Sequence, residues 1–204
     1  MKVGLMVECG REGLEAVVCR RICDLLRQNH GADIEIDIVP MNNKRHLIEQ
    51  SGATASALLQ TGIDRVVILW DERPAWPKTG EKLCWHNDRA DILANLSGHN
   101  VQIEKVGLVC IEREFESWLL FDHPMLSNML SRPTHMVVVP KQNRPDRNPD
   151  PKGTMTSLMR QLAGETYVDV QFAARFAKHL VSLNKLKKCS TFKRFVLKLA
   201  VISL

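Results

Sequence analysis

Acidic residues stand where several predicted strands of this chain end. Glu8 ends an apolar segment at 2–8, and Asp71 and Glu72 follow the apolar run 66–70. Another apolar segment is followed by Glu112, Glu114 and Glu116. If the strands are parallel, their carboxyl ends meet at one edge of the sheet, where ligand sites form. Carboxylate oxygens suit Mg²⁺ or Mn²⁺, and such a centre can hold a phosphate and activate a water for phosphodiester cleavage.

These acids also have a purely structural interpretation. A carboxylate in the first turn of a helix is favoured by the helix dipole, whatever the function of the chain. The acids open to this interpretation are Glu12, Glu15, Glu112, Glu114 and Glu116. Glu8 and Asp71 are harder to explain in this way, because each ends an apolar strand, where a charge needs a partner.

Strand and helix patterns alternate through the first 120 residues. The predicted strands lie at 2–8, 33–39, 64–70 and 101–111, and the predicted helices at 14–26, 44–60, 81–97 and 113–121. This alternation predicts an α/β, Rossmann-like fold with a roughly four-stranded, mainly parallel sheet covered on both faces. The strict alternation at 33–39 predicts a strand near a sheet edge, and the wholly apolar run at 66–70 a central strand.

The pattern changes after residue 140. A loop rich in Pro, Asn, Asp and Arg is followed only by helical signals, at about 152–163, 168–182 and 190–200. We therefore predict an α/β domain at 1–140, and at 141–204 a loop and a basic helical C-terminal extension packed on it.

The positive charge of the chain is concentrated in this extension. The net charge is +5, yet no Asp or Glu follows Asp169, so the rest of the chain is slightly acidic. The candidate binding residues for a nucleic-acid backbone or an acidic partner are Lys178, Lys185, Lys187, Lys188, Lys193 and Arg194. These residues are interleaved with apolar ones, so solvated helix faces explain them equally well.

Composition excludes several other classes of protein. The 204 residues are 45% hydrophobic and 25% charged, as in an ordinary globular protein and unlike a disordered chain or a disulfide miniprotein. No apolar run is long enough to span a bilayer, and the N-terminus is a poor signal peptide. Six cysteines without paired metal spacing agree with a reducing, cytoplasmic location.

Several segments resemble Toprim-type proteins. Residues 7–12, Val-Glu-Cys-Gly-Arg-Glu, resemble the opening V-E-G-x-x-E of Toprim domains, and 66–71 resembles their second motif, an apolar strand ending in aspartate. Residues 114–122 read E-F-E-S-W-L-L-F-D and resemble the E-x-E-A-W-L-L-A-D signature of a Toprim-like bacterial family of unknown function. Downstream features of that family are matched by Pro151-Lys152, Tyr167 and 189–192. Its members often accompany ABC-type ATPases in phage-defence islands.

The resemblance implies a Toprim fold, a Mg²⁺-binding acidic site and a nuclease role with a partner ATPase. Glu8 matches the Toprim glutamate, expected to act as general acid or base, and Asp71 matches the first metal-binding aspartate. The usual Asp-x-Asp motif is broken, because Arg73 occupies the second aspartate position. Arginine cannot ligate a metal, although it can hold a phosphate. Either an acid among Glu72, Glu114 and Glu116 supplies the missing ligand, or the site is weakened.

Lys152 is a further candidate for the site, because it follows the Pro-rich loop, opens a helix and so can reach a scissile phosphate. A solvated lysine is the alternative.

Our first hypothesis is a Mg²⁺- or Mn²⁺-dependent nuclease subunit of a bacterial anti-phage system, acting on DNA or RNA with an ABC-type or AAA ATPase. The alternative is an inactive interaction module that docks onto the ATPase, which Arg73 favours. A nucleotide-binding Rossmann protein fits less well, since Gly10 and Gly13 lack the G-x-G-x-x-G spacing. Homo-oligomerisation is left open.

Overall fold

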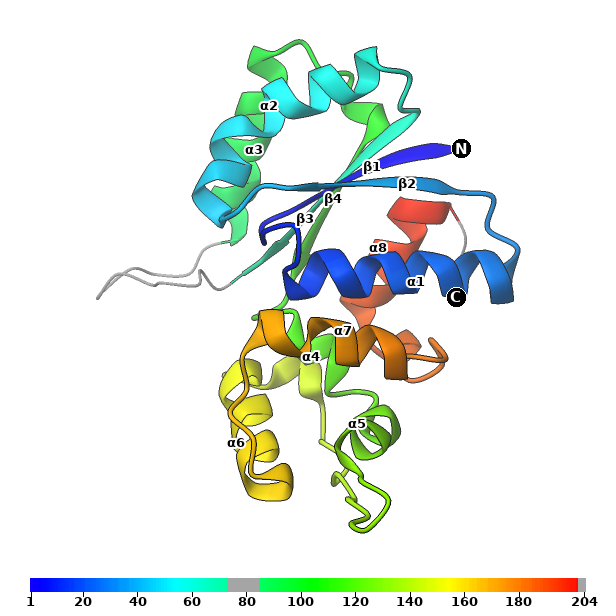
Figure 1. Cartoon of the computed structure of the whole chain (residues 1–204). Helices are drawn as coiled ribbons and strands as arrows, with labels where there is room; N and C mark the ends of the chain where they lie inside the picture. The colour runs from blue at the N-terminus through cyan, green and yellow to red at the C-terminus, as the bar shows by residue number, and fades with distance from the viewer. Residues whose placement is uncertain (73–84, 202–204) are drawn as a thin grey trace.

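The described part of the chain, residues 1–72 and 85–201 of the computed structural model, contains a four-stranded parallel sheet in the order β2-β1-β3-β4 (Figure 1). Its strands are β1 (Lys2–Val7), β2 (Glu35–Pro40), β3 (Arg65–Asp71) and β4 (Val106–Ile111). The predicted α/β class is confirmed. The alternating segment forms the edge strand β2, and the apolar run forms β3, which lies inside the sheet.

Helices cover both faces of this sheet, and the two faces have separate cores. Strand residues Val67 and Leu69 pack with α1 (Leu14–His30) and α8 (Ser190–Ala200). Their neighbours Ile68 and Trp70 pack on the other face with α2 (Lys44–Gln60) and α3 (Trp85–Gly98). Figure 1 shows α2 and α3 on one side of the strands and α1 and α8 on the other. The side chains of β3 point alternately to the two faces, so both faces of this strand are buried.

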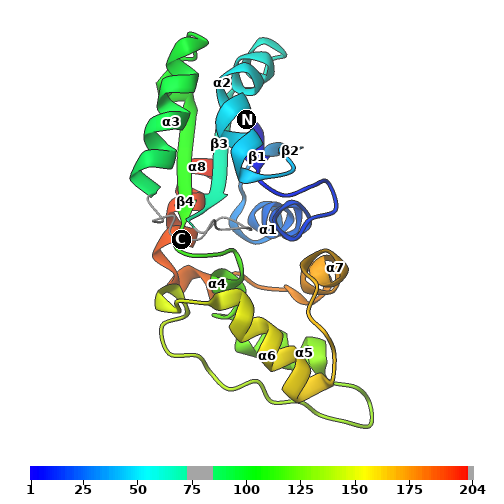
Figure 2. The same ribbon diagram turned by 90° about the vertical axis from the view of Figure 1, so that its left-hand side faces the viewer.

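The remaining helices lie beyond the carboxyl edge of the sheet (Figures 1 and 2). They are α4 (Glu116–Leu119), α5 (His123–Leu130), α6 (Pro151–Ala163) and α7 (Asp169–His179). Short 3₁₀ turns occur at η1 (Ile103–Lys105), η2 (Pro145–Arg147) and η3 (Leu186–Lys188). The helix predicted at 113–121 is only the short α4, and α5, which was not predicted from the sequence, follows it. Asp122 separates them, because its side chain accepts a hydrogen bond from the Met125 amide (3.1 Å) and caps α5.

The predicted C-terminal extension shares a core with the α/β domain. Helix α7 packs against α1, and α8 packs against β4. One buried cluster contains residues of β1, β3 and α8 together. The boundary at residue 140 therefore stays a prediction. Within the described ranges, no helix has the length and apolar character needed to cross a membrane.

Candidate metal centre

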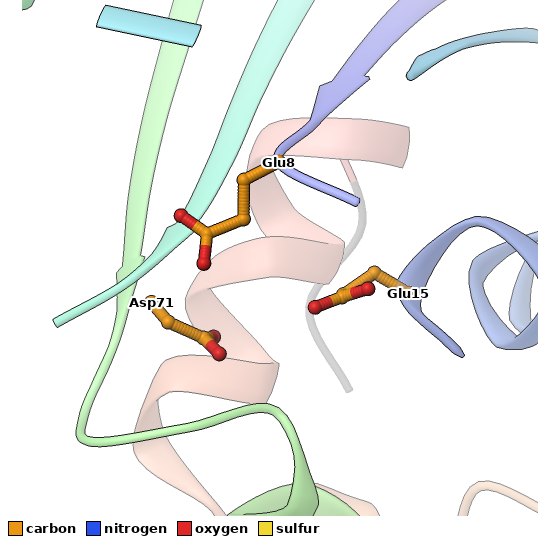
Figure 3. Close-up of side chains that lie close together, drawn as sticks. All are labelled: Glu8, Glu15 and Asp71. Atoms are coloured by element: carbon orange, nitrogen blue, oxygen red, sulfur yellow. The ribbon is translucent and has the colours of Figure 1, made fainter. Parts of the chain in front are cut away.

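Three carboxylates meet at the carboxyl edge of the sheet. Glu8 follows β1, Asp71 ends β3 and Glu15 lies in the first turn of α1. One carboxylate oxygen from each lies within 4.8 Å of the others. Figure 3 shows the three side chains pointing toward one another from these separate elements. We call these three residues the acidic cluster.

The local sequence brings the cluster together. β1 and β3 are hydrogen-bonded neighbours, so their ends, and with them Glu8 and Asp71, lie side by side. The turn after β1 is tight, since the Gly13 amide donates to the Gly10 carbonyl (2.9 Å). A Cβ on Gly13 would lie 2.4 Å from the Cβ of Cys9, so only glycine fits there. This turn starts α1 at the same sheet edge and places Glu15 opposite Glu8.

The donor set of the cluster fits a divalent cation. Asp71 is only 7% exposed, and its Oδ2 accepts a hydrogen bond from the Phe115 amide (3.2 Å). Glu8 Oε2 and Asp71 Oδ1 are buried, and neither has a hydrogen-bond partner among the residues that the structure describes. Unpartnered buried oxygens cost stability, whereas hard oxygen ligands are those that Mg²⁺ and Mn²⁺ prefer.

Burial and mutual repulsion alter the protonation of the cluster. Burial, together with the charge of Glu15, raises the pKa of Glu8 to about 8. Burial also raises the pKa of Glu15 and, with the charge of Glu8, that of Asp71. Without a cation these carboxylates therefore retain protons that exposed acids would lose. A cation between them would favour their ionised forms.

The cluster lies in an open pocket of about 710 Å³. Glu114, Glu116 and Lys152 also line this pocket, so the structure brings these three sequence candidates to the site. Glu116 is 4% exposed, and its Oε1 accepts a hydrogen bond from the Tyr167 hydroxyl (2.9 Å). Burial raises the pKa of Glu116 to about 7. We call this space the acidic pocket.

Lys152 links two walls of the acidic pocket. Its backbone amide donates to Glu114 Oε2 (3.0 Å), and its Nζ donates to Asp169 Oδ2 (2.8 Å). The lysine side chain is about half exposed, and its partner Asp169 opens α7. The contacts of Lys152 with Glu114, which precedes α4, and with Asp169 of α7 therefore keep its positive charge at the acidic pocket.

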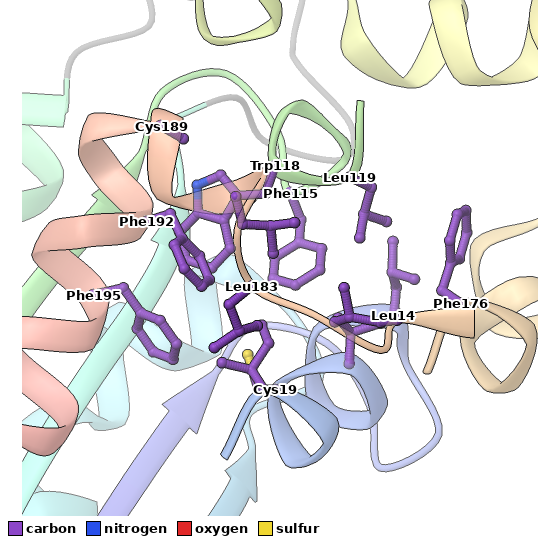
Figure 4. Close-up of a cluster of buried hydrophobic side chains, with 14 of the residues drawn as sticks. Leu14, Cys19, Phe115, Trp118, Leu119, Phe176, Leu183, Cys189, Phe192 and Phe195 are labelled. Atoms are coloured by element: carbon purple, nitrogen blue, oxygen red, sulfur yellow. The ribbon is translucent and has the colours of Figure 1, made fainter. Parts of the chain in front are cut away.

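An aromatic cluster positions Glu116 in the wall of the acidic pocket. The Trp118 ring lies 5.2 Å from the Phe192 ring and 5.3 Å from the Phe195 ring, centroid to centroid. Its Nε1 donates to Thr191 Oγ1 (2.8 Å). Figure 4 shows the Trp118, Phe192 and Phe195 side chains gathered between α4 and α8. The C-terminal helix thereby anchors the short helix that carries Glu116.

Glu72 is placed away from the acidic cluster. Its Oε2 accepts a hydrogen bond from the Arg113 amide (3.3 Å) and lies 3.7 Å from Arg113 Nη1. It lines a different pocket, which Asp71 does not reach. Arg73, the other residue of the altered motif, lies outside the described residues.

The predicted basic residues are spread over several surfaces. Lys185 and Lys188 line a pocket beside η2, and Arg194 lines the pocket that contains Glu72. Lys178 lies on α7, Lys187 in η3 and Lys193 on α8. Their roles stay a prediction.

Two residues of the site were missed by the sequence reasoning. Glu15 was interpreted as a helix-dipole charge, although the Gly10–Gly13 turn signalled that the first turn of α1 returns to the same edge as Glu8. Lys44, which opens α2, donates from Nζ to the carbonyls of Asp71 and Glu72 (both 2.9 Å) and pairs with Asp88 Oδ2 (2.7 Å). The sequence signal for Lys44 was its position at the start of the predicted helix 44–60, since a helix that follows a parallel strand begins at the carboxyl edge of the sheet.

The chain was compared with protein-family models, curated protein sequences and solved structures, and none of the three comparisons gave a match. The resemblance to Toprim-like proteins therefore stays a prediction that rests on the quoted motifs. The acidic cluster itself is a group of residues that can bind a metal ion.

Proposed function

We propose that this chain is a Mg²⁺- or Mn²⁺-dependent nuclease of the Toprim type. The observation that carries the proposal is the convergence of Glu8, Glu15 and Asp71, two of which hold buried oxygens without partners in the described residues. Acceptor groups alone, at the carboxyl edge of a parallel sheet, favour a divalent cation over an anionic ligand.

The three cluster residues would hold the cation, and Glu116 would stand next to them. A divalent cation supplies two effects when bound: it stabilises negative charge on a phosphate and lowers the pKa of a water. Glu8, ionised when the cation is bound, would accept a proton from the attacking water and return it to the leaving alcohol oxygen. Lys152 would contact a non-bridging phosphate oxygen through Nζ, exchanging its contact with Asp169.

The proposed cellular role follows from the resemblance alone. We propose an ABC-type or AAA ATPase as partner, a bacterial anti-phage system as the setting, and the cytoplasm as the location. The motifs at 114–122 and at 189–192 support this role, because both resemble the pattern of the ATPase-associated family.

A second function is favoured by a specific observation. Glu72 pairs with Arg113 and the following position is Arg73, so neither residue after Asp71 adds a carboxylate to the cluster. A chain with one incomplete metal centre would suit an interaction module that docks onto the ATPase. Such a module would bind its partner without cleaving nucleic acid.

Cleavage assays with matched variants separate the two functions. Plasmid, single-stranded DNA and tRNA are incubated with Mg²⁺ or Mn²⁺ and the wild-type protein, Glu8→Gln or Asp71→Asn, with and without EDTA. The nuclease proposal predicts cleavage by the wild type only, abolished by EDTA, with both variants folded by circular dichroism. Cleavage that resists EDTA, or full activity in both variants, would remove this mechanism.

A further inference from the structure

A second polar pocket, of about 600 Å³, lies on the other side of the end of β3. Four arginines from four separate segments line it: Arg89 of α3, Arg113 after β4, Arg147 of η2 and Arg194 of α8. We call it the arginine pocket. Segments so far apart in the sequence meet there only in the folded chain, so the grouping is a product of the fold and not of a local charge run.

The donors of the arginine pocket exceed its acceptors. Trp70 lines it with a side chain that is 2% exposed, and the indole N–H has no hydrogen-bond partner in the described part of the chain. An indole N–H can only donate, so it requires an acceptor. Arg89, Arg147 and Arg194 have no carboxylate within ion-pair distance among the described residues.

The pocket also contains acids, and two of them are already paired. Glu72 is paired with Arg113, and Asp146 lies 3.4 Å from Arg144 outside the pocket. Glu112 is the remaining acid of the lining. Arg89, Arg147 and Arg194 therefore outnumber the single carboxylate of the lining, Glu112, that is available to pair with them. Guanidinium groups and an indole N–H together match the oxygens of a phosphate.

A neighbouring pocket of about 440 Å³ continues the positive charge across η2. Its basic residues are Lys141, Arg144, Lys185 and Lys188, and it shares Asp146 with the arginine pocket. We call it the lysine pocket. Basic side chains spread over two adjoining pockets suit a ligand with several phosphates in a row better than they suit a single small anion.

We propose that a nucleic-acid strand binds through its phosphates across the arginine pocket and the lysine pocket. The inference rests on the proposed nuclease function and deepens it by locating the substrate. Asp71 of the acidic cluster and Glu72 of the arginine pocket are consecutive residues, and Lys44 Nζ holds both of their carbonyls (2.9 Å each). A strand in the arginine pocket therefore passes beside the acidic cluster.

A binding assay without metal tests this inference separately from cleavage. The probe is a fluorescent single-stranded DNA, measured by anisotropy in EDTA against the wild type and the double variant Arg147→Gln/Arg194→Gln. The control is Arg20→Gln/Arg160→Gln, which removes the same charge from exposed positions on α1 and α6. Unfolding midpoints of all three proteins establish that the fold is unchanged.

The arginine-pocket variant is expected to bind at least about tenfold more weakly than the wild type, and the control within about twofold. The slope of log affinity against log salt should fall by about 1.4 in the variant, since each lost phosphate contact on a single strand contributes about 0.7. Arginine-dependent binding without cleavage under any metal would uphold the inference and refute the proposed nuclease. Equal weakening of both variants, or absence of DNA binding by the wild type, would overturn it.

Discussion

The acidic pocket and the arginine pocket lie on opposite sides of the end of one strand, and their unpaired groups are of opposite kinds. Among residues 1–72 and 85–201, the unpartnered buried atoms of the acidic pocket are carboxylate oxygens of Glu8 and Asp71, whereas that of the arginine pocket is the Trp70 indole nitrogen. The alternation of β3 produces this difference, because successive side chains point to opposite faces. Asp71 therefore faces the α1 side, while Trp70 and Glu72 face the other.

The comparison shows that adjacent carboxylates need not share a site. Asp71 and Glu72 follow each other in the sequence, yet one joins the acidic cluster and the other pairs with an arginine. An acceptor-rich space suits a cation and a donor-rich space suits an anion. The two together suit a metal-dependent enzyme acting on a phosphate ester.

The largest expected effect is a difference in cleavage between variants of Asp71 and Glu72, which are adjacent in the sequence. Asp71→Asn should lower metal-dependent cleavage by about 10²–10⁴-fold, because it removes a charge from the cluster. Glu72→Gln should change cleavage by less than about tenfold, since its carboxylate pairs with Arg113 instead. Single-turnover rates at saturating metal measure both. Equal losses in the two variants would break the comparison between the two faces of β3.

The pH dependence of stability gives the next largest effect. The folded chain holds the Glu8 proton up to about pH 8, whereas the unfolded chain loses it near 4.5. Folded protein binds more protons between these values, so its stability is greatest below pH 4.5 and falls as pH rises through 8. In EDTA the contribution of Glu8 to this loss should be on the order of 5 kcal/mol in the free energy of unfolding, as measured with urea.

Two controls sharpen this result. Glu8→Gln should make the profile less steep, because the amide does not titrate. The raised pKa values of Glu15, Asp71 and Glu116 maintain the rest of the slope. Added Mg²⁺ should stabilise the wild type most at high pH, where the carboxylates are ionised. A metal-free wild type that becomes more stable over the same interval would contradict the raised pKa values.

A smaller effect is expected at the turn that positions Glu15. Gly13→Ala would place a methyl 2.4 Å from the Cβ of Cys9 and should cost about 1–3 kcal/mol while weakening metal affinity. Gly98→Ala is the matched control, because no atom lies within 4 Å of the added Cβ. That substitution at the end of α3 should be neutral or slightly stabilising. Unchanged metal binding in Gly13→Ala would show that the turn does not position Glu15.

The smallest predicted effect concerns Tyr167. Tyr167→Phe removes the hydrogen bond to Glu116 Oε1 and should cost about 1 kcal/mol in unfolding free energy. It should leave the arginine pocket unaffected, so DNA binding in EDTA should match that of the wild type. Thermal unfolding and anisotropy measure the two quantities, and a loss of DNA affinity would show that the pockets are coupled.

The sheet was predictable because its signals are local. The alternation at 33–39 and the apolar run at 66–70 give an edge strand and an inner strand directly. The helix predicted at 113–121 is only the short α4, and α5 was missed because its start depends on the Asp122 side chain, which caps it. Capping depends on the path of the chain, which hydrophobic spacing does not reveal.

The site was predictable only in part, for a similar reason. Glu8 and Asp71 were found because a charge at the end of an apolar strand is unusual, and Glu114 and Glu116 because they follow another predicted strand at the same edge of the sheet. Glu15 was missed because a first-turn acid is ordinary in any helix, and only the Gly13 turn distinguishes it. The arginine pocket has no local signal, since it is assembled from four distant segments.

Calorimetric titration of Mg²⁺ and Mn²⁺ tests the central claim most directly. The wild type, Asp71→Asn and the matched control Glu72→Gln are compared at a pH above 8, where the Glu8 carboxylate is ionised. The acidic cluster predicts micromolar-to-millimolar binding by the wild type and by Glu72→Gln, and none by Asp71→Asn. Equal binding by all three proteins, or loss of binding in Glu72→Gln but not in Asp71→Asn, would contradict a metal centre built on Glu8, Glu15 and Asp71.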